Sequence, residues 1–179
     1  SGGEWASACL ALGHAHEIQI LEETSFFDNP ALLYRAFAAY LGLEPSSHDQ
    51  LQELAYGGQP KFENKIIEQV LDLKGDGSFK LNMQFFRFLS EFEMTGHGFE
   101  KLFGVPSRKG EASWQQSHFD LAASIQKVIE EILFRMARHA RGMTQNRRLC
   151  LAVDSILSRT AANGRILKER IFEEIFLPP

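Results

Sequence analysis

The sequence predicts an α/β domain in which helices pack on a mixed sheet. Three observations support this class: apolar residues alternate near the start, residues 114–141 have the pattern of one long amphipathic helix, and residues 148–177 follow a strand–helix–strand order. The first pattern is typical of an antiparallel hairpin and the last of a parallel pair. At 179 residues, the chain is expected to form one domain.

Composition and charge exclude several classes of partner. The chain has 19 Lys and Arg against 23 Asp and Glu, a formal net charge of −4, and no basic stripe that would neutralise a nucleic-acid backbone. No apolar run approaches the roughly 20 residues that a bilayer requires. Cys9 and Cys150 lie in apolar runs, so we expect buried free thiols in a reducing, cytoplasmic compartment. Neither a nucleic acid nor a membrane is an expected partner.

The first elements are expected to be a hairpin and a capped helix. Residues 5–13 and 17–23 alternate around a short Gly-containing connection, which predicts two paired strands. Asn29 and Pro30 predict a helix start, because Asn caps exposed N–H groups and Pro lacks the one that would stay unpaired. Gly42 predicts the left-handed end of that helix.

The middle of the chain is expected to contain a helix, a turn, a strand and an irregular segment. Apolar residues at helical spacing predict a helix over 62–73, and alternation predicts a strand over 78–82. Between them Gly75-Asp-Gly77 predicts a turn; with Asp72 it also resembles a calcium loop, but the ligand spacing and the terminal Glu are missing. Residues 83–112 are rich in aromatic and helix-breaking residues.

The helix over 114–141 carries the clearest local pattern. Ser113 and Gln116 are expected to form a capping box at its start. Glu131 and Arg135, four residues apart on its polar face, are expected to form an ion pair. The predicted apolar face comprises Ala122, Ile125, Val128, Ile129, Ile132, Leu133, Met136 and Ala140.

Residues 148–177 are expected to place a ligand site at one sheet edge. A buried strand over 148–153 precedes a helix over 155–171 and a second strand over 174–177. Asp154 therefore follows a strand, at the carboxyl edge where α/β proteins bind ligands. Asn163 and Gly164 interrupt the helix, which favours either an anion or nucleotide contact or a capping and packing role.

Two further pairs are weaker candidates. His14 and His16 fall on one side of a strand and would suit a metal, although a hairpin connection explains them equally well. His118 and Asp120 near the start of the long helix would suit acid–base catalysis, whereas an Asp there is also favoured by the helix dipole.

Taken in order, seven motifs resemble one family over essentially all 179 residues, the ATP-dependent O-carbamoyltransferases, which include nodulation, cephem and aminoglycoside carbamoyltransferases. The matching segments are Gly3-Glu-Trp-Ala-Ser7, Leu32-Leu-Tyr-Arg-Ala-Phe37, Asp76-Gly-Ser-Phe-Lys-Leu-Asn-Met83, Phe99-Glu-Lys-Leu-Phe-Gly104, Ala122-Ala-Ser-Ile-Gln-Lys-Val128, Leu149-Cys-Leu-Ala152 and Ala162-Asn-Gly-Arg-Ile-Leu167. The resemblance implies an actin-like ATPase (ribonuclease H-like) fold, with residues 1–179 forming part of the N-terminal domain.

The resemblance also implies a reaction. In the family, carbamoyl phosphate and ATP form a carbamoyl-adenylate in a separate C-terminal domain, and the actin-like domain transfers the carbamoyl group to a substrate hydroxyl with the help of iron. The nucleotide-binding positions that this implies here are Asp154, Ser158, Asn163 and Gly164. Docking to a C-terminal domain, or self-association through an open sheet edge, is also expected.

The chain departs from the family pattern where chemistry is expected. The paired histidines and a metal-binding Asp would precede Ser1, and a Gly-Asp-Ala-Gly segment would follow Pro179, so we expect no metal ligand and no catalytic residue within the chain. The family's Gly-Gly turn is replaced by residues 153–158, and Gln50 and Glu53 replace a Lys and a Gly. We therefore expect the isolated chain to be inactive. A degenerate binding or regulatory relative, and an unrelated structural α/β domain, are the alternatives.

Overall fold

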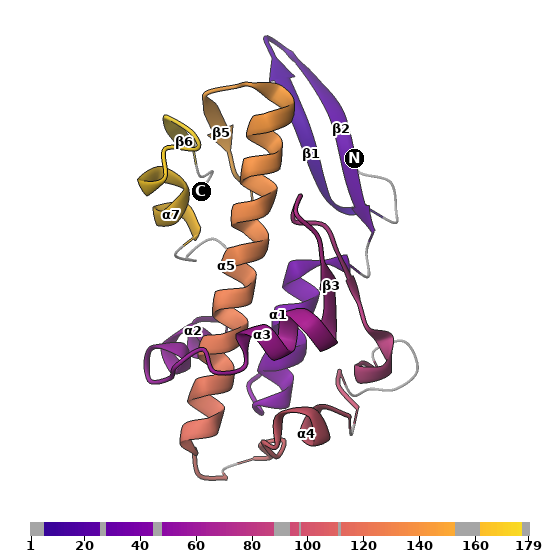
Figure 1. Cartoon of the computed structure of the whole chain (residues 1–179), viewed down its shortest axis with the longest axis vertical. Helices are drawn as coiled ribbons and strands as arrows, with labels where there is room; N and C mark the ends of the chain where they lie inside the picture. Colours follow the sequence, from indigo (N-terminus) through magenta and orange to yellow (C-terminus); the bar gives the residue numbers. More distant parts are fainter. Residues whose placement is uncertain are drawn as a thin grey trace.

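The computed structural model describes residues 6–25, 28–44, 48–87, 94–96, 98–110, 112–152 and 162–176. In these ranges, three two-stranded sheets and several shorter helices surround one long helix, α5 (Gln116–Thr144), which runs through the length of the molecule (Figure 1). The α/β class is confirmed. Within the described residues, no helix is both long enough and apolar enough to cross a bilayer.

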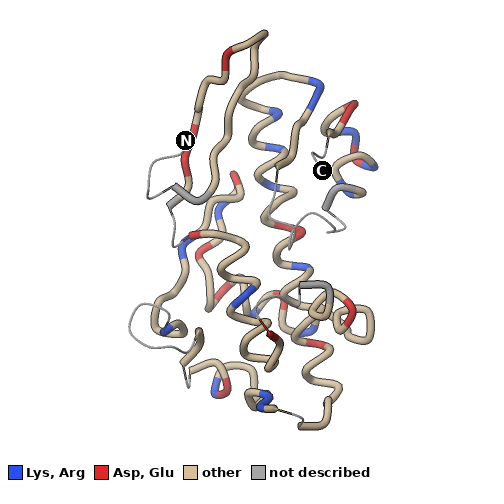
Figure 2. The backbone as a smooth tube through the Cα atoms, turned by 180° about the vertical axis from the view of Figure 1, so that it is seen from behind, with Lys and Arg blue, Asp and Glu red and all other residues tan. Residues whose placement is uncertain are grey.

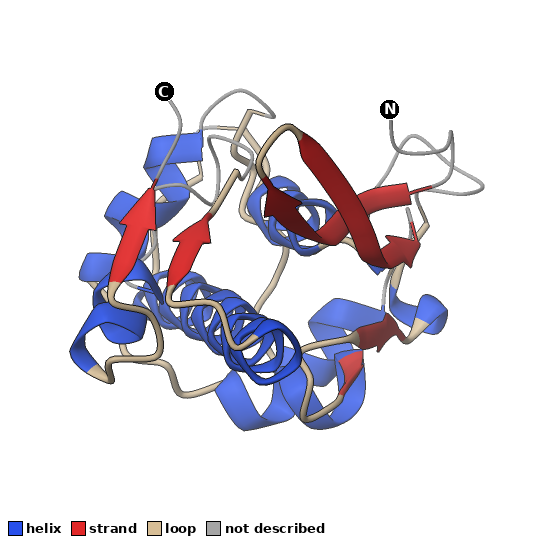
Figure 3. Ribbon diagram, turned by 90° about the horizontal axis from the view of Figure 1, so that it is seen from above, coloured by secondary structure: helices blue, strands red, loops and turns tan. Residues whose placement is uncertain are grey.

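The expected mixed sheet is not formed by the described residues, because their antiparallel and parallel pairs belong to separate sheets. The hairpin and the C-terminal strands lie at separate places around α5 (Figure 3). Leu10 of the hairpin and Leu149 and Ile175 of the C-terminal strands pack against the same apolar cluster, whose members include Phe134 and Ala137 of α5. Both strand pairs therefore pack against α5 without pairing with each other.

The predicted hairpin is confirmed. Strand β1 (Ala6–His14) pairs antiparallel with β2 (Glu17–Ser25), and His14 lies opposite Glu17. The turn between them places Ala15 in the left-handed region at φ 53°. Leu10 contacts the cluster on α5, whereas Ile18 of β2 is 78% exposed.

The prediction that Cys9 and Cys150 are buried is wrong, since both thiols are free and exposed. Successive residues of a strand point to opposite faces. Leu10 and Leu149 contact the cluster around α5, so the neighbouring cysteines face away from it. The apolar runs did not predict burial of the cysteines, because the sheets that contain them contact the cluster around α5 on one face only.

The first helix follows the predicted pattern. Helix α1 (Pro30–Tyr40) is capped by Asn29, whose Oδ1 accepts the Ala31 N–H at 2.8 Å, and Gly42 has φ 69°. Helix α2 (His48–Tyr56) comes next. The segment 83–112, expected to be irregular, contains the 3₁₀ turn η3 (Met83–Phe85) and the short helix α4 (Gly98–Phe103) in its described part.

The helix predicted over 62–73 is too long. Helix α3 (Glu63–Lys65) continues as a π-helical turn, η2 (Ile66–Val70), and the chain then enters strand β3 (Leu71–Leu73). Strand β3 pairs antiparallel with β4 (Phe79–Leu81) across the predicted turn. The helical spacing misled here because Leu71 and Leu73 also satisfy a period of two, and pairing with β4 decides between the two patterns.

The turn between these strands is built by its own side chains. Asp76 Oδ1 accepts hydrogen bonds from Ser78 N at 2.8 Å and from Ser78 Oγ at 2.6 Å, which supports the turn interpretation over a calcium loop. Gly77 has φ 88°, and a Cβ there would lie 2.6 Å from Met136 N and Cγ. The turn therefore packs directly against α5.

Helix α5 begins two residues later and ends three residues later than predicted, and its capping residues differ. Gln115 precedes the first helical residue, and its N–H donates to Nδ1 of His118 at 3.1 Å, so the expected Ser113–Gln116 box is wrong. The predicted apolar face is buried, with Met136 packed at its edge. The Glu131–Arg135 pair is confirmed, with Nε and Oε1 2.8 Å apart.

The C-terminal strand–helix–strand unit is confirmed in its described part. Strand β5 (Arg148–Cys150) pairs parallel with β6 (Glu174–Phe176), and helix α7 (Ala162–Lys168) lies between them in sequence. The first part of the predicted helix over 155–171 lies outside the described residues. The prediction of a buried strand is wrong for β5, because Arg148 and Cys150 are exposed and Leu149 is partly buried.

Candidate functional site

The sequence predicts a ligand site at the carboxyl edge of the parallel pair. Because β5 and β6 are parallel, the chain leaves both strands at the same edge. Asp154 and Ser158 follow β5 and lie outside the described residues. Asn163 is the second residue of α7, and Gly164 is exposed, with open space around the position of a Cβ.

The motif that contains Asn163 and Gly164 continues with a residue of clear function in the fold. Arg165 Nη1 contacts Glu131 Oε2 of α5 at 2.6 Å, and its Nε contacts Glu169 at 3.0 Å. The same guanidinium lies over the ring of Phe134, 3.6 Å from its centroid. The next residue, Ile166, is buried in the cluster that includes Phe134. Arg165 and Ile166 thus hold α7 against α5.

Glu131 is the central acceptor of this contact. Its carboxylate receives one guanidinium from Arg135 on its own helix and one from Arg165 on α7. Burial alone would raise the pKa of Glu131, but the hydrogen bonds and charges of the two arginines outweigh it and hold the pKa below its ordinary value. The ion pairs therefore connect the candidate ligand helix to the core helix.

His118 and Asp120 do not form an acid–base pair. His118 accepts from Gln115 N–H at Nδ1, and its Nε2 lies 3.4 Å from Pro106 O, which fits the tautomer with hydrogen on Nε2. Asp120 instead binds Lys61 Nζ at 2.6 Å and the Gln59 N–H at 2.9 Å. Its side chain is 5% exposed. Both residues hold neighbouring segments at the start of α5.

The other metal candidates gain no further ligand. His14 and His16 are exposed at the hairpin turn. Among the described residues, no group of three or more His, Cys, Asp or Glu side chains is placed to hold a metal ion. The described residues therefore do not fit an iron site.

The segment around α2, in which two residues depart from the family pattern, has an exposed part and a packed part. Gln50 and Glu53, the two replaced positions, are exposed on α2. The end of the same segment packs tightly on α5: a Cβ on Gly58 would lie 2.0 Å from Phe119 O. The glycine at position 58 is thus required by helix packing.

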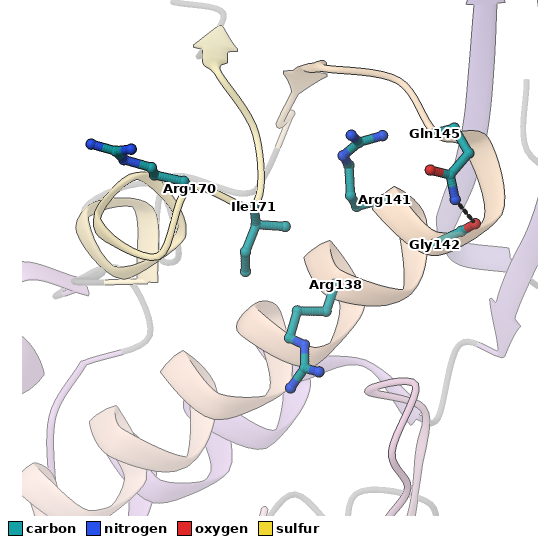
Figure 4. A pocket seen from close by; sticks show the side chains of 6 residues that line it. All are labelled: Arg138, Arg141, Gly142, Gln145, Arg170 and Ile171. Carbon is teal, nitrogen blue, oxygen red and sulfur yellow. Dashed lines mark hydrogen bonds between the residues drawn. The ribbon is translucent and has the colours of Figure 1, made fainter.

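A shallow pocket of about 370 Å³ lies away from the predicted site, and three arginines line it. One side of the pocket is formed by the end of α5 and the residue after it, with Arg138, Arg141, Gly142 and Gln145. The other side is formed by the turn between α7 and β6, with Arg170 and Ile171 (Figure 4). Gln145 precedes β5, and Arg170 and Ile171 precede β6. The pocket therefore lies toward the amino ends of the parallel strands and not at their carboxyl edge.

Sequence reasoning missed this pocket, although a signal was present. Nine of the 19 Lys and Arg residues fall between positions 135 and 170, a range that holds only two acidic residues. Arg and Lys positions recur along the part of α5 near its C-terminal end (Figure 2). The pocket could not be inferred from this signal, because nothing in the sequence shows that the turn after α7 packs beside the end of α5.

The chain belongs to the family described as carbamoyltransferase N-terminus, whose model matches residues 1–179. This membership confirms the resemblance of the sequence motifs. A relative from Synechocystis, named only as an uncharacterized protein, is 37% identical over 178 residues. The nodulation protein NolNO of Sinorhizobium fredii is 30% identical, and the nodulation protein NolO of Bradyrhizobium diazoefficiens is 26% identical.

All three matches cover 99% of the chain but only part of each relative. The chain spans 29% of the Synechocystis protein, 24% of NolNO and 30% of NolO. A carbamoyltransferase family is thus shown for residues 1–179, and the activity of a whole protein is a separate question.

Proposed function

We propose that the chain is part of the N-terminal, actin-like domain of a cytoplasmic enzyme that transfers a carbamoyl group from carbamoyl phosphate to a substrate hydroxyl. ATP-dependent adenylation would activate the carbamoyl group. The observation that carries the proposal is the family match over all 179 residues. The parallel β5–β6 pair joined through α7 supports a ribonuclease H-like arrangement.

The transfer step needs an activated carbamoyl carbon and a leaving group. The acceptor's hydroxyl oxygen attacks the carbamoyl carbon of the adenylate, and a new C–O bond forms. The bond from that carbon to the AMP phosphate oxygen breaks, AMP leaves with the bonding electrons, and the hydroxyl proton passes to solvent or a base. A domain outside this chain would form the adenylate, in keeping with the fraction of each relative that the chain covers.

The edge after β5 is the proposed nucleotide side of this chain, with Asp154, Ser158, Asn163 and Gly164 as its residues. Arg165 supports this assignment because it fixes α7, which carries Asn163 and Gly164, against α5. Asp154 opposes ordinary phosphate binding: two unit charges 4 Å apart repel by about 4 kcal/mol at an effective dielectric of about 20. We expect weak binding of ATP to this chain, and Asp154→Gly should strengthen it.

We further propose that residues 1–179 alone do not catalyse transfer. The described residues do not fit an iron site, so no step is routed through iron on this chain. The catalytic assembly would require docking to the enzyme's C-terminal domain. The alternative of a degenerate binding or regulatory relative is favoured by the replacements at Gln50, Glu53 and Asp154.

The test compares the whole native protein with residues 1–179. We expect the whole protein to release pyrophosphate from ATP only when carbamoyl phosphate is present, and to yield AMP with a hydroxyl acceptor. We expect residues 1–179 to give no turnover above a no-protein control. Turnover by the isolated chain would refute its inactivity, and a whole protein without carbamoyl-phosphate-dependent pyrophosphate release would refute the enzyme assignment in favour of the degenerate relative.

Calorimetric titration with ATP tests the nucleotide edge separately. We expect no micromolar binding to residues 1–179 and a measurable gain for Asp154→Gly, with Asp72→Gly, at an exposed position of β3, as the matched charge control. Micromolar binding by the unmodified chain would contradict the repulsion at Asp154.

A further inference from the structure

The pocket between the end of α5 and the turn after α7 carries an unbalanced positive charge. Arg138, Arg141 and Arg170 line it, and no acidic side chain is among its lining residues. The C-terminal end of a helix carries about half a negative elementary charge. That partial charge offsets only a small part of three guanidinium charges.

Besides the excess of positive charge, the pocket contains an arginine nitrogen without a hydrogen-bond partner, on Arg141. Its Nη1 is covered by protein and has no hydrogen-bond partner, and it is the one buried side-chain nitrogen or oxygen of the described residues in that state. A buried donor without an acceptor costs about 1–3 kcal/mol, and more when it is charged. By contrast Arg165, on the neighbouring helix, has carboxylates within 2.6 Å and 3.0 Å. The missing component at Arg141 is therefore an acceptor.

Two residues that line the pocket have a left-handed backbone conformation. Gln145 and Arg170 both have φ 53°, in the left-handed region that glycine usually occupies at helix ends. Ile171 N bonds Ile166 O at 3.1 Å and Arg170 N bonds Leu167 O at 3.0 Å, so the turn that carries Arg170 is closed on itself. The wall that carries Arg170 is thus fixed by backbone hydrogen bonds.

We propose that this pocket binds the phosphate group of a small-molecule phosphate ester, with Arg141 as the central donor. Figure 4 shows the three guanidinium groups directed apart, as expected for like charges without a counterion between them. A dianionic tetrahedral group matches several arginines better than a single carboxylate does, because it offers more charge and oxygens in several directions. Arg138 and Arg170, both exposed, would turn toward the ligand, and the side chain of Arg141 would turn with them, which brings its covered Nη1 to the phosphate.

The test measures thermal unfolding and calorimetric binding with inorganic phosphate as the probe, at constant ionic strength. We expect saturable stabilisation by phosphate and by sulfate, with acetate much weaker. Arg141→Met should reduce phosphate affinity by about tenfold or more and should raise the melting temperature in phosphate-free buffer, because the unpaired charge is removed. Arg148→Met, an exposed arginine on β5 outside the pocket lining, should behave like the unmodified chain.

Arg170→Met on the opposite wall keeps the test decisive if Arg141→Met does not fold. It should weaken phosphate binding without loss of stability. The proposal is overturned if Arg141→Met or Arg170→Met binds phosphate as tightly as the unmodified chain. It is also overturned if acetate stabilises as strongly as phosphate, which would indicate a carboxylate site. These outcomes are independent of carbamoyl transfer.

Discussion

Arg165 on α7 and Glu131 on α5 are joined by a 2.6 Å contact between Nη1 and Oε2, although 34 residues separate them in sequence. The contact fixes the position of the helix that carries Asn163 and Gly164. One residue of a family motif is thus explained by packing rather than by contact with a ligand.

Removing Arg165 should therefore loosen α7. We expect Arg165→Gln to lower the free energy of unfolding by about 1–3 kcal/mol, between the values typical of exposed and buried ion pairs, because its side chain is 33% exposed. Arg148→Gln should change it by less than about 0.5 kcal/mol. Urea denaturation measures both, and a double-mutant cycle with Glu131→Gln should give a clear coupling. Additive effects would contradict the pairing.

Stability should fall in acid because carboxyl groups that lie at helix contacts, Asp120 and Glu131, have lowered pKa values in the fold. Burial would raise the pKa of Asp120, but hydrogen bonds from Lys61, the Gln59 N–H and Gln116 outweigh it; Glu131 is lowered against burial by its arginines. A group with a depressed folded pKa contributes stability above its unfolded pKa, here near the ordinary 3.8 for Asp and 4.5 for Glu, and loses it as pH falls through the folded pKa.

We expect the unfolding free energy to be level from pH 7 to about 5 and to decline below about pH 4.5. Asp120→Asn should reduce stability at pH 7 and flatten the decline, whereas Asp72→Asn should leave the profile unchanged. Denaturation curves recorded at each pH would show the difference, and equal slopes for the Asp120 variant and the unmodified chain would refute the assignment.

Gly58 should not tolerate a side chain. Its Cβ would lie 2.0 Å from Phe119 O, and the backbone of α5 cannot yield without disturbing Asp120 and its partners. We expect Gly58→Ala to cost about 3 kcal/mol or more. Gly75→Ala, which meets nothing within 4 Å, is the matched control and should be close to neutral. Thermal melts of the two variants compare them directly.

Phe99 should be the most sensitive ring of the main core. It is fully buried, and its centroid lies 5.1 Å from that of Phe37, 5.2 Å from Tyr40 and 5.4 Å from Phe103. We expect Phe99→Ala to cost about 3–5 kcal/mol and Phe99→Leu distinctly less, because leucine leaves a smaller cavity. Chemical denaturation provides the measurement; a cost below about 1 kcal/mol for Phe99→Ala would contradict this role.

The elements whose ends are marked by Asn or Gly residues were predicted correctly. Asn29 and Gly42 bound α1, and Gly75–Gly77 marks the turn before β4. The helix predicted over 62–73 was too long, because Leu71 and Leu73 fit both the helical spacing and the alternation of a strand. Pairing with β4 decides that they form a strand. The burial of Cys9 and Cys150 was misjudged for a related reason: an apolar run does not say which faces of a strand are covered.

By itself, the sequence determined the family, the hairpin, the long helix and the parallel strands, because these depend on spacing within short segments or on motifs in order. The tertiary structure alone decided which charges from distant segments meet. Arg165 forms an ion pair with Glu131, whereas Arg141 lines a pocket with Arg138 and Arg170, and its Nη1 has no acceptor. Ion pairing depends on distances between segments far apart in the chain, and these exist only once α7 and its turn pack against α5.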